Sequence, residues 1–302
     1  MSFDRFFTSS ILAALIAVSP ADAAGPDSSH DSACALAIEA PADAEFSLPF
    51  RTVDGRIYLD AMVDGEGPFA FALDTGASGM GRADATLVDA LNLPADGMDE
   101  TSDGVSSSQV DKVRIASLTL GGLERRDLSV IARDYRSRVS AEAAFSGILG
   151  REFFADGLLA IDFSTRRLTF YRSREMPASL RDATTYERAF RIPVTIGDFE
   201  TTGNVDTGAN VTMVVPGTVF SEVEGTAAGP AGGGSLTNTR IDIFDAELAG
   251  PVRIGGVRLE NIPVKVAADY PEVLIGAHAL QGHVVLIDQR HSTLAICKSA
   301  AP

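Results

Sequence analysis

The sequence predicts a mainly β chain that folds into two similar lobes. Asp-Thr-Gly-Ala occurs twice, at residues 74–77 and 206–209, and the segments that follow each copy repeat in the same order. Short apolar runs separated by turns rich in Gly, Asp and Pro are typical of strands. The repeat is far longer than a solenoid unit, so a duplicated lobe is expected rather than a repeat array.

In each Asp-Thr-Gly-Ala segment, the carboxylate of the Asp directly follows an apolar run. Residues 71–73 lead into Asp74, and the second apolar run leads into Asp206. A buried charge must be solvated or shared, so two carboxylates at equivalent places are expected to act as a pair. A single Asp-Thr-Gly would be interpreted more simply as a turn, in which Asp bonds its own backbone and Gly supplies a positive φ.

Three further segments follow both aspartates in the same order. An apolar run containing Gly-Gly comes first, then two apolar residues followed by Gly, then an apolar strand that reaches an Asp. These segments are residues 118–123, 148–150 and 158–163 in the first half, and 252–257, 274–276 and 284–289 in the second. The same order at similar spacing predicts one lobe for each half of the chain.

With these residues in place, the chain resembles the aspartic peptidases, which carry Asp-Thr-Gly in duplicate, each followed by two hydrophobic residues and Gly. Ala77 and Ala209 are more similar to the retropepsin-type branch than to the pepsin branch, which usually carries Ser or Thr there. The resemblance extends from about residue 46 to residue 297. It implies a two-lobed acid-protease fold with a pseudo-twofold axis, in which each lobe is a small closed β-barrel-like unit with one or two short helices.

The resemblance also implies the site residues. Asp74 and Asp206 would be a catalytic dyad that shares one proton, as is known for aspartic proteases, and would activate a water for attack on a peptide bond. Two threonines would brace the loops, and two glycines would allow the tight turn and offer N–H groups to the carboxylates. The supporting residues are Thr75, Gly76, Thr207 and Gly208, and the residues that pack behind the dyad are Leu149, Gly150, Ile275 and Gly276.

The two alanines also lead to an expectation about pH. Ala77 and Ala209 have no hydroxyl that could stabilise an ionised aspartate. Losing a hydrogen bond to the charged form raises the pKa of a carboxyl group. We therefore expect activity at mildly acidic to neutral pH rather than at very low pH.

The N-terminus predicts export to the periplasm or secretion. Arg5 precedes an apolar run over residues 11–18, and Ala21-Asp22-Ala23 is typical of a cleavage site. The run is shorter than the about 20 residues that a membrane-spanning helix needs. We expect residues 1–23 to be a signal peptide, with no stable membrane insertion after cleavage; an uncleaved anchor or a buried strand is the alternative.

The remaining boundaries follow from composition. We expect a flexible N-terminal segment over residues 24–44, a first lobe over 45–174, a linker over 175–188 and a second lobe over 189–299. A short helix is expected at 83–91. The polar residues 96–109 are expected to be flexible, and the resemblance places a flap there; the Gly-rich residues 229–234 are expected to be a mobile loop at the equivalent position.

The two cysteines, Cys34 and Cys297, favour a disulfide between the N-terminal segment and the second lobe over two free thiols, because the chain is expected to be exported. The four histidines show no zinc-ligand spacing, and residues 229–234 lack the Lys-Ser/Thr ending of a phosphate loop. No cofactor or metal is therefore expected.

A formal net charge of −16 argues against a nucleic-acid partner. The resemblance implies a polypeptide substrate. One chain carries both aspartates, so a monomer is expected. The alternative function is a two-lobed peptide-binding protein of the same fold that is catalytically weak or inactive; because both Asp-Thr-Gly triplets are intact, the sequence favours an enzyme.

Overall fold

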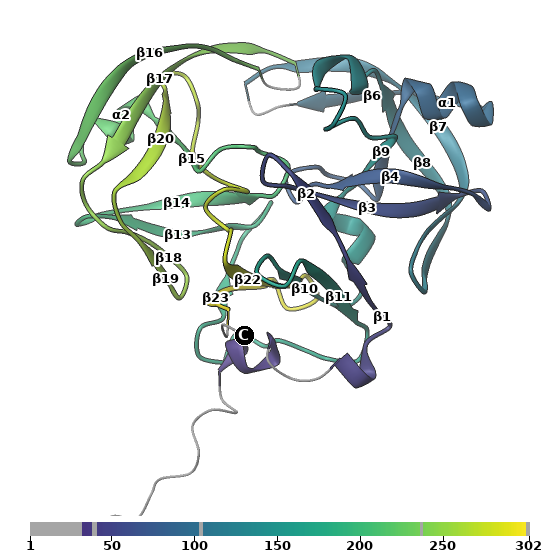
Figure 1. The fold of residues 1–302 in the computed structure, drawn as a ribbon, viewed down its shortest axis with the longest axis horizontal. Coiled ribbons are helices and arrows are strands. Elements are labelled where there is room, and N and C mark those ends of the chain that lie inside the picture. The colour runs from purple at the N-terminus through teal and green to yellow at the C-terminus, as the bar shows by residue number, and fades with distance from the viewer. Residues whose placement is uncertain (1–31, 38–40, 103–104, 236–237, 300–302) are drawn as a thin grey trace, which may run out of the picture.

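The computed structural model describes residues 32–37, 41–102, 105–235 and 238–299. These residues form mainly β structure, arranged as two lobes above a shared sheet (Figure 1). The predicted mainly β, two-lobed fold is therefore confirmed. The predicted signal peptide, residues 1–23, lies outside the described residues. In the described part of the chain, no helix is long and apolar enough to cross a membrane.

The first lobe is built on an eight-stranded sheet in the order β2-β3-β4-β9-β5-β8-β7-β6. Pairing of Met62 with Thr119 and of Val63 with Leu118 joins β3 to β7 and closes this sheet on itself. Its strands are β2 (Arg51–Val53), β3 (Arg56–Val63), β4 (Glu66–Leu73), β5 (Gly81–Asp84), β6 (Ala95–Ser102), β7 (Ser107–Leu120), β8 (Leu123–Arg133) and β9 (Gly147–Leu149).

The predicted helix at 83–91 is two residues shorter than expected. Strand β5 continues through Asp84, and helix α1 (Ala85–Leu91) begins only where the Asp84 carboxylate accepts a hydrogen bond from the Thr86 N–H. An acceptor side chain at this position satisfies a donor that the first helical turn leaves open. The helix ends at Asn92, which adopts a left-handed conformation with φ 51°.

The second lobe is built on a nine-stranded sheet in the order β16-β17-β20-β15-β21-β14-β13-β18-β19. No pairing among the described residues closes this sheet, so the closed barrel-like unit expected for each lobe is found only in the first. Its elements are β13 (Arg191–Ile196), β14 (Phe199–Asp206), β15 (Met213–Pro216), α2 (Gly217–Phe220), β16 (Gly225–Ser235), β17 (Arg240–Leu248), β18 (Val252–Ile254), β19 (Val257–Leu259), β20 (Ile262–Ala267) and β21 (Val273–Gly276).

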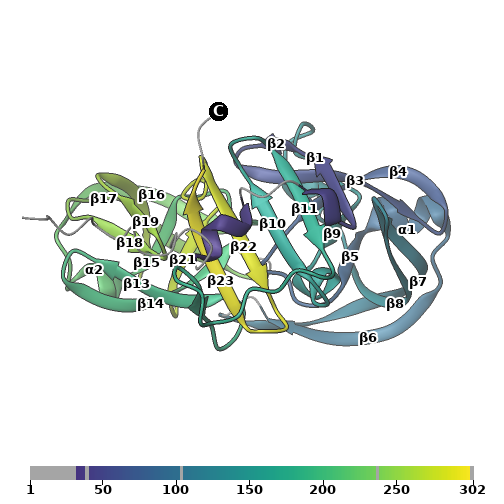
Figure 2. The ribbon, with the colours of Figure 1, turned by 90° about the horizontal axis from the view of Figure 1, so that it is seen from below.

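A third, six-stranded sheet joins the two lobes from below (Figure 2). Its two central strands are the repeated apolar strands of the two halves, β10 and β22, which pair antiparallel with each other. The duplicated strands are therefore direct neighbours. The sheet consists of β1 (Phe46–Pro49), β11 (Arg167–Tyr171), β10 (Leu158–Asp162), β22 (His283–Asp288), β23 (Thr293–Lys298) and β12 (Thr184–Thr185).

The described part of the N-terminal segment is ordered and covers the shared sheet. It forms two 3₁₀ helices, η1 (Ala33–Ala37) and η2 (Pro41–Asp43). The predicted disulfide is present: Cys34 is bonded to Cys297 in β23, with 5.6 Å between their Cα atoms. It closes a loop of 263 residues, and in the chain-entropy model such a cross-link stabilises by up to about 5 kcal/mol. The segment expected to be flexible is thus tied to the fold.

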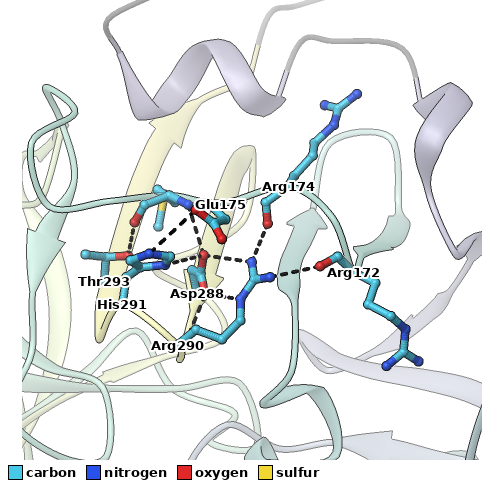
Figure 3. A network of polar contacts seen from close by, with 8 residues as sticks. Arg172, Arg174, Glu175, Asp288, Arg290, His291 and Thr293 are labelled. Carbon is cyan, nitrogen blue, oxygen red and sulfur yellow. Dashed lines mark hydrogen bonds and ion pairs between the residues drawn. The ribbon is translucent and has the colours of Figure 1, made fainter.

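The segment between the lobes is held by a buried carboxylate, Asp288, at the end of β22 (Figure 3). Asp288 accepts hydrogen bonds from the Met176 N–H at 2.9 Å and from the Arg290 guanidinium at 2.9 Å, and His291 Nδ1 lies 3.0 Å from it. Burial by itself raises the pKa of Asp288, but these hydrogen bonds outweigh it and hold the pKa below its usual value. Arg290 also donates to the carbonyl of Arg172, at 2.9 Å.

Candidate active site

The two Asp-Thr-Gly segments meet because each lobe delivers its copy from an equivalent strand. Strand β4 runs parallel to β9 and leads into Asp74, whose N–H donates to the Leu149 carbonyl at 3.1 Å. Strand β14 runs parallel to β21 and ends at Asp206, which lies opposite Gly276. The same strand pair therefore supports each aspartate from behind.

Leu149 and Ile275 lie on the strands that support the two Asp-Thr-Gly loops, and Gly150 and Gly276 lie beside them. Leu149 and Ile275 are fully buried. Gly150 and Gly276 make room for the loops, since a Cβ at either position would lie 2.2 Å from a backbone carbonyl oxygen, that of Gly79 or Val211 respectively. A side chain at either glycine would therefore displace the loop that carries the aspartate.

The two threonines tie the loops together reciprocally. Thr75 Oγ1 donates to the Val205 carbonyl at 2.9 Å and accepts from the Thr207 N–H at 3.0 Å. Thr207 Oγ1 donates to the Leu73 carbonyl at 2.8 Å and accepts from the Thr75 N–H at 3.1 Å. Both threonines are buried. Because every bond crosses between the lobes, the pair fixes the distance between the two aspartates.

Replacing Thr207 by valine is expected to destabilise the fold and to lower activity. The change removes one hydroxyl and leaves the Thr75 N–H and the Leu73 carbonyl buried without partners, and each unsatisfied group costs about 1–3 kcal/mol. Urea unfolding of Thr207→Val and of Thr207→Ser, which keeps the hydroxyl, measures this cost. Equal stability of the two variants would show that the bonds contribute nothing.

The two carboxyl groups act electrostatically as one unit. Asp206 Oδ1 accepts from the Gly208 N–H at 2.8 Å, and Asp74 Oδ1 accepts from the Ala77 N–H at 2.9 Å. Burial first, then the negative charge of Asp74 and a hydrogen bond with its carboxyl group, raise the pKa of Asp206 to about 8, against the opposing effect of the Gly208 N–H. Two carboxylates in such contact share a proton.

The two glycines of the motifs lie in tight turns, in which the Ala77 N–H donates to the Asp74 carbonyl at 3.2 Å and the Ala209 N–H donates to the Asp206 carbonyl at 3.4 Å. Neither Gly76 nor Gly208 adopts a positive φ. A Cβ on Gly76 would lie 2.5 Å from Asp206 Oδ2, and a Cβ on Gly208 would lie 2.4 Å from Asp74 Cγ. Each glycine therefore leaves space for the aspartate of the opposite lobe. In the first lobe, the donor that the structure shows is the N–H of Ala77, one residue after Gly76.

Two hairpins, one from each lobe, approach each other at the top of Figure 1. Asn238, from the second, binds the first: its Nδ2 donates to the carbonyls of Thr101 at 3.1 Å and Ser106 at 3.0 Å. Its Oδ1 accepts from Ser108 Oγ at 3.0 Å and from Arg133 at 2.7 Å. Sequence reasoning missed Asn238, because no pattern in the chain distinguishes it.

Both hairpins consist of paired strands in segments that we expected to be flexible. Within residues 96–109, most of the described residues belong to β6 and β7, which pair antiparallel, as the implied flap requires. Residues 229–234 belong to β16, which pairs with β17. The Gly-rich strand is accommodated by two irregularities in register, near Gly229 and Gly232, whose φ values are 119° and 94°. Backbone pairing needs no apolar pattern, so composition alone could not reveal these strands.

Two features can be compared with known proteins: the two similar β lobes, and the paired aspartates on loops tied between them. The family model described as aspartyl protease matches residues 59–153 of this chain. The crystal structure of the aspartic proteinase from Irpex lacteus aligns with a TM-score of 0.52 and 14% identity, over 84% of this chain and 97% of that one. A search of curated proteins finds no match. Together, the family model and the shared fold support an aspartic peptidase family.

Proposed function

We propose that this chain is an aspartic endopeptidase that uses Asp74 and Asp206 to hydrolyse peptide bonds. The observation that carries the proposal is the contact between the two carboxyl groups, which raises the pKa of Asp206, together with the reciprocal threonine bonds that tie their loops. A dyad with one proton holds a base and an acid side by side at the same pH. The family model and the fold support this class of enzyme.

The reaction needs no group beyond the dyad and one water. The ionised carboxylate accepts a proton from the water, whose oxygen attacks the peptide carbonyl carbon, while the protonated carboxyl donates its proton to the carbonyl oxygen. The C–N bond of the tetrahedral diol then breaks as the carboxyl group that took the water proton gives it to the leaving nitrogen. One diol hydroxyl gives its proton to the other carboxylate, so a carboxylic acid and an amine are released and the dyad again holds one proton. The raised pKa belongs to the pair rather than to either residue, so the dyad is treated as one acid–base unit.

Activity is expected from mildly acidic pH to near neutrality. The dyad works with one proton, and the pKa of about 8 at Asp206 means that this proton is lost only as the pH rises through that value. Cleavage of an unfolded, casein-like protein by the chain lacking residues 1–23, assayed from pH 3 to 8, tests the proposal. An optimum below about pH 3, where even an ordinary Asp is mostly protonated, would contradict the expected pH range.

The peptide-binding alternative predicts a different outcome of the same assay. A folded chain that binds peptides but cleaves none between pH 3 and 8 would favour it.

We also propose that the mature protein is an exported monomer, periplasmic or secreted. The Cys34–Cys297 disulfide supports an oxidising compartment, and both halves of the dyad belong to one chain, so the site needs no second subunit.

A further inference from the structure

A buried arginine close to the dyad has no carboxylate partner in the described part of the chain. Arg82, in β5, is only 8% exposed, and its Nε is buried without a hydrogen-bond partner. None of the ion pairs between described residues includes it. A buried charge without a partner is costly. Such a group in a stable fold suggests an anion that is bound during function.

The nearest acidic residue along the strand is already engaged. Asp84 is fully buried. One of its oxygens accepts from the Thr86 N–H at 2.9 Å, and the other accepts from the N–H groups of Tyr135 at 2.8 Å and Arg136 at 2.9 Å. Asp84 therefore caps α1 and holds the segment after β8 in place, rather than forming an ion pair with Arg82.

The strand register places Arg82 beside the catalytic loop of the first lobe. Arg82 lies opposite Ile148 in β9, and Ile148 lies opposite Ala72 in β4, two residues before Asp74. Residues opposite one another on neighbouring strands share one face of the sheet. Arg82 thus continues the row of Ala72 and Ile148, and these two residues belong to an apolar cluster against which Tyr135 packs.

Tyr135 presents a second unsatisfied group at the same place. Its hydroxyl oxygen is buried and has no hydrogen-bond partner of normal geometry. Burial raises the pKa of the Tyr135 hydroxyl, the positive charge of Arg82 and a hydrogen-bonding contact with its side chain oppose that rise, and the negative charge of Asp74 makes a smaller contribution in the same direction as burial. The hydroxyl therefore lies within electrostatic range of both Arg82 and the dyad.

The segment that carries Tyr135 also borders a cavity of about 490 Å³. Arg133 and Asp134, immediately before Tyr135, line it together with Ser108 of the first hairpin and Asn238 of the second. The cavity thus lies between the two hairpins and the end of β8. Arg82 and Tyr135 do not themselves line the cavity, but its wall includes Arg133 and Asp134, which directly precede Tyr135 in the chain.

We propose that Arg82 and Tyr135 form a subsite for a carboxylate side chain, so that the enzyme prefers polypeptides with Asp or Glu close to the cleaved bond. This inference rests on the proposed function. A guanidinium can donate two parallel hydrogen bonds to a carboxylate, and the tyrosine hydroxyl adds a third donor. The apolar neighbours Ile148 and Ala72 limit water access, which strengthens an ion pair.

Matched peptides that differ only by Glu or Gln at each position around the cleaved bond test the subsite. Wild type is expected to cleave the best Glu peptide with a kcat/KM roughly 10- to 100-fold above that of its Gln partner, as a charge-assisted hydrogen-bonded pair permits. Arg82→Met should bring this ratio close to one while cleavage of the Gln peptide persists. Arg136→Met, a matched change at an exposed arginine on the same segment, should keep the preference.

A binding measurement separates this inference from the proposed function. In the Asp206→Asn background, the Glu peptide should bind about tenfold or more tightly than the Gln peptide, and adding Arg82→Met should abolish the difference. Binding preference without any cleavage by wild type would overturn the proposed peptidase activity and leave the subsite standing. Equal binding of both peptides would overturn the subsite. If Arg82→Met does not fold, Arg82→Lys, which keeps the charge but loses the two-pronged geometry, should still reduce the ratio.

Discussion

Asp206→Asn is expected to lower peptide cleavage by roughly 10²–10⁴-fold, the usual contribution of a general acid or base. Asparagine has nearly the same shape as aspartate but cannot take up or release the shared proton. Asp74→Asn should have an effect of the same order, because the dyad works as a pair. Cleavage of the casein-like substrate at the optimal pH measures both. Residual activity within about tenfold of wild type would show that the chemistry lies elsewhere.

The same change should alter how stability depends on pH. The pKa of Asp206 is about 8 in the folded protein, whereas the ordinary pKa of an aspartate is 3.8. Between these values the folded state binds one more proton than the unfolded state, so stability falls as the pH rises from about 4 through about 8. Asp206→Asn removes the titrating group and should flatten this slope in thermal melts. Asp60→Asn, at an exposed position of β3, should change neither the slope nor the cleavage.

Gly208→Ala is expected to have the second largest effect. The added Cβ would lie 2.4 Å from Asp74 Cγ, so the two carboxyl groups must move apart. Overpacking of this kind costs about 1–3 kcal/mol of stability, and a misplacement of about 1 Å at a reacting group can cost about 100-fold in rate. The loss of stability should appear in urea unfolding, and the loss of rate should appear in cleavage assays of the same variant.

The control for this change is Gly217→Ala. There the nearest atom, Ala268 Cα, would be 3.3 Å from the new Cβ, and no carboxylate is near. Cleavage by this variant should remain close to wild type. If Gly208→Ala were fully active, the aspartates would tolerate a displacement that the proposed mechanism does not allow.

The duplicated motif let the sequence predict both the two-lobed fold and the pair Asp74 and Asp206. The features that allow this prediction are close together in the sequence, because an apolar strand, a carboxylate and a small-residue turn lie within a few residues in each copy. The repeat then requires that equivalent positions lie in equivalent places, so the meeting of the two loops follows from symmetry. The disulfide could likewise be predicted from the sequence, because Cys34 and Cys297 are the only two cysteines.

Only the tertiary structure decided how the halves are joined and what surrounds the dyad. The pairing of β10 with β22 and the bonds of Asn238 to the opposite hairpin connect residues more than a hundred positions apart. No periodicity in the chain encodes such contacts. The space that Gly76 and Gly208 provide, and the burial of Arg82 without an acidic partner, depend likewise on which side chains pack there. Sequence determines the local element, whereas burial and neighbours are properties of the assembled fold.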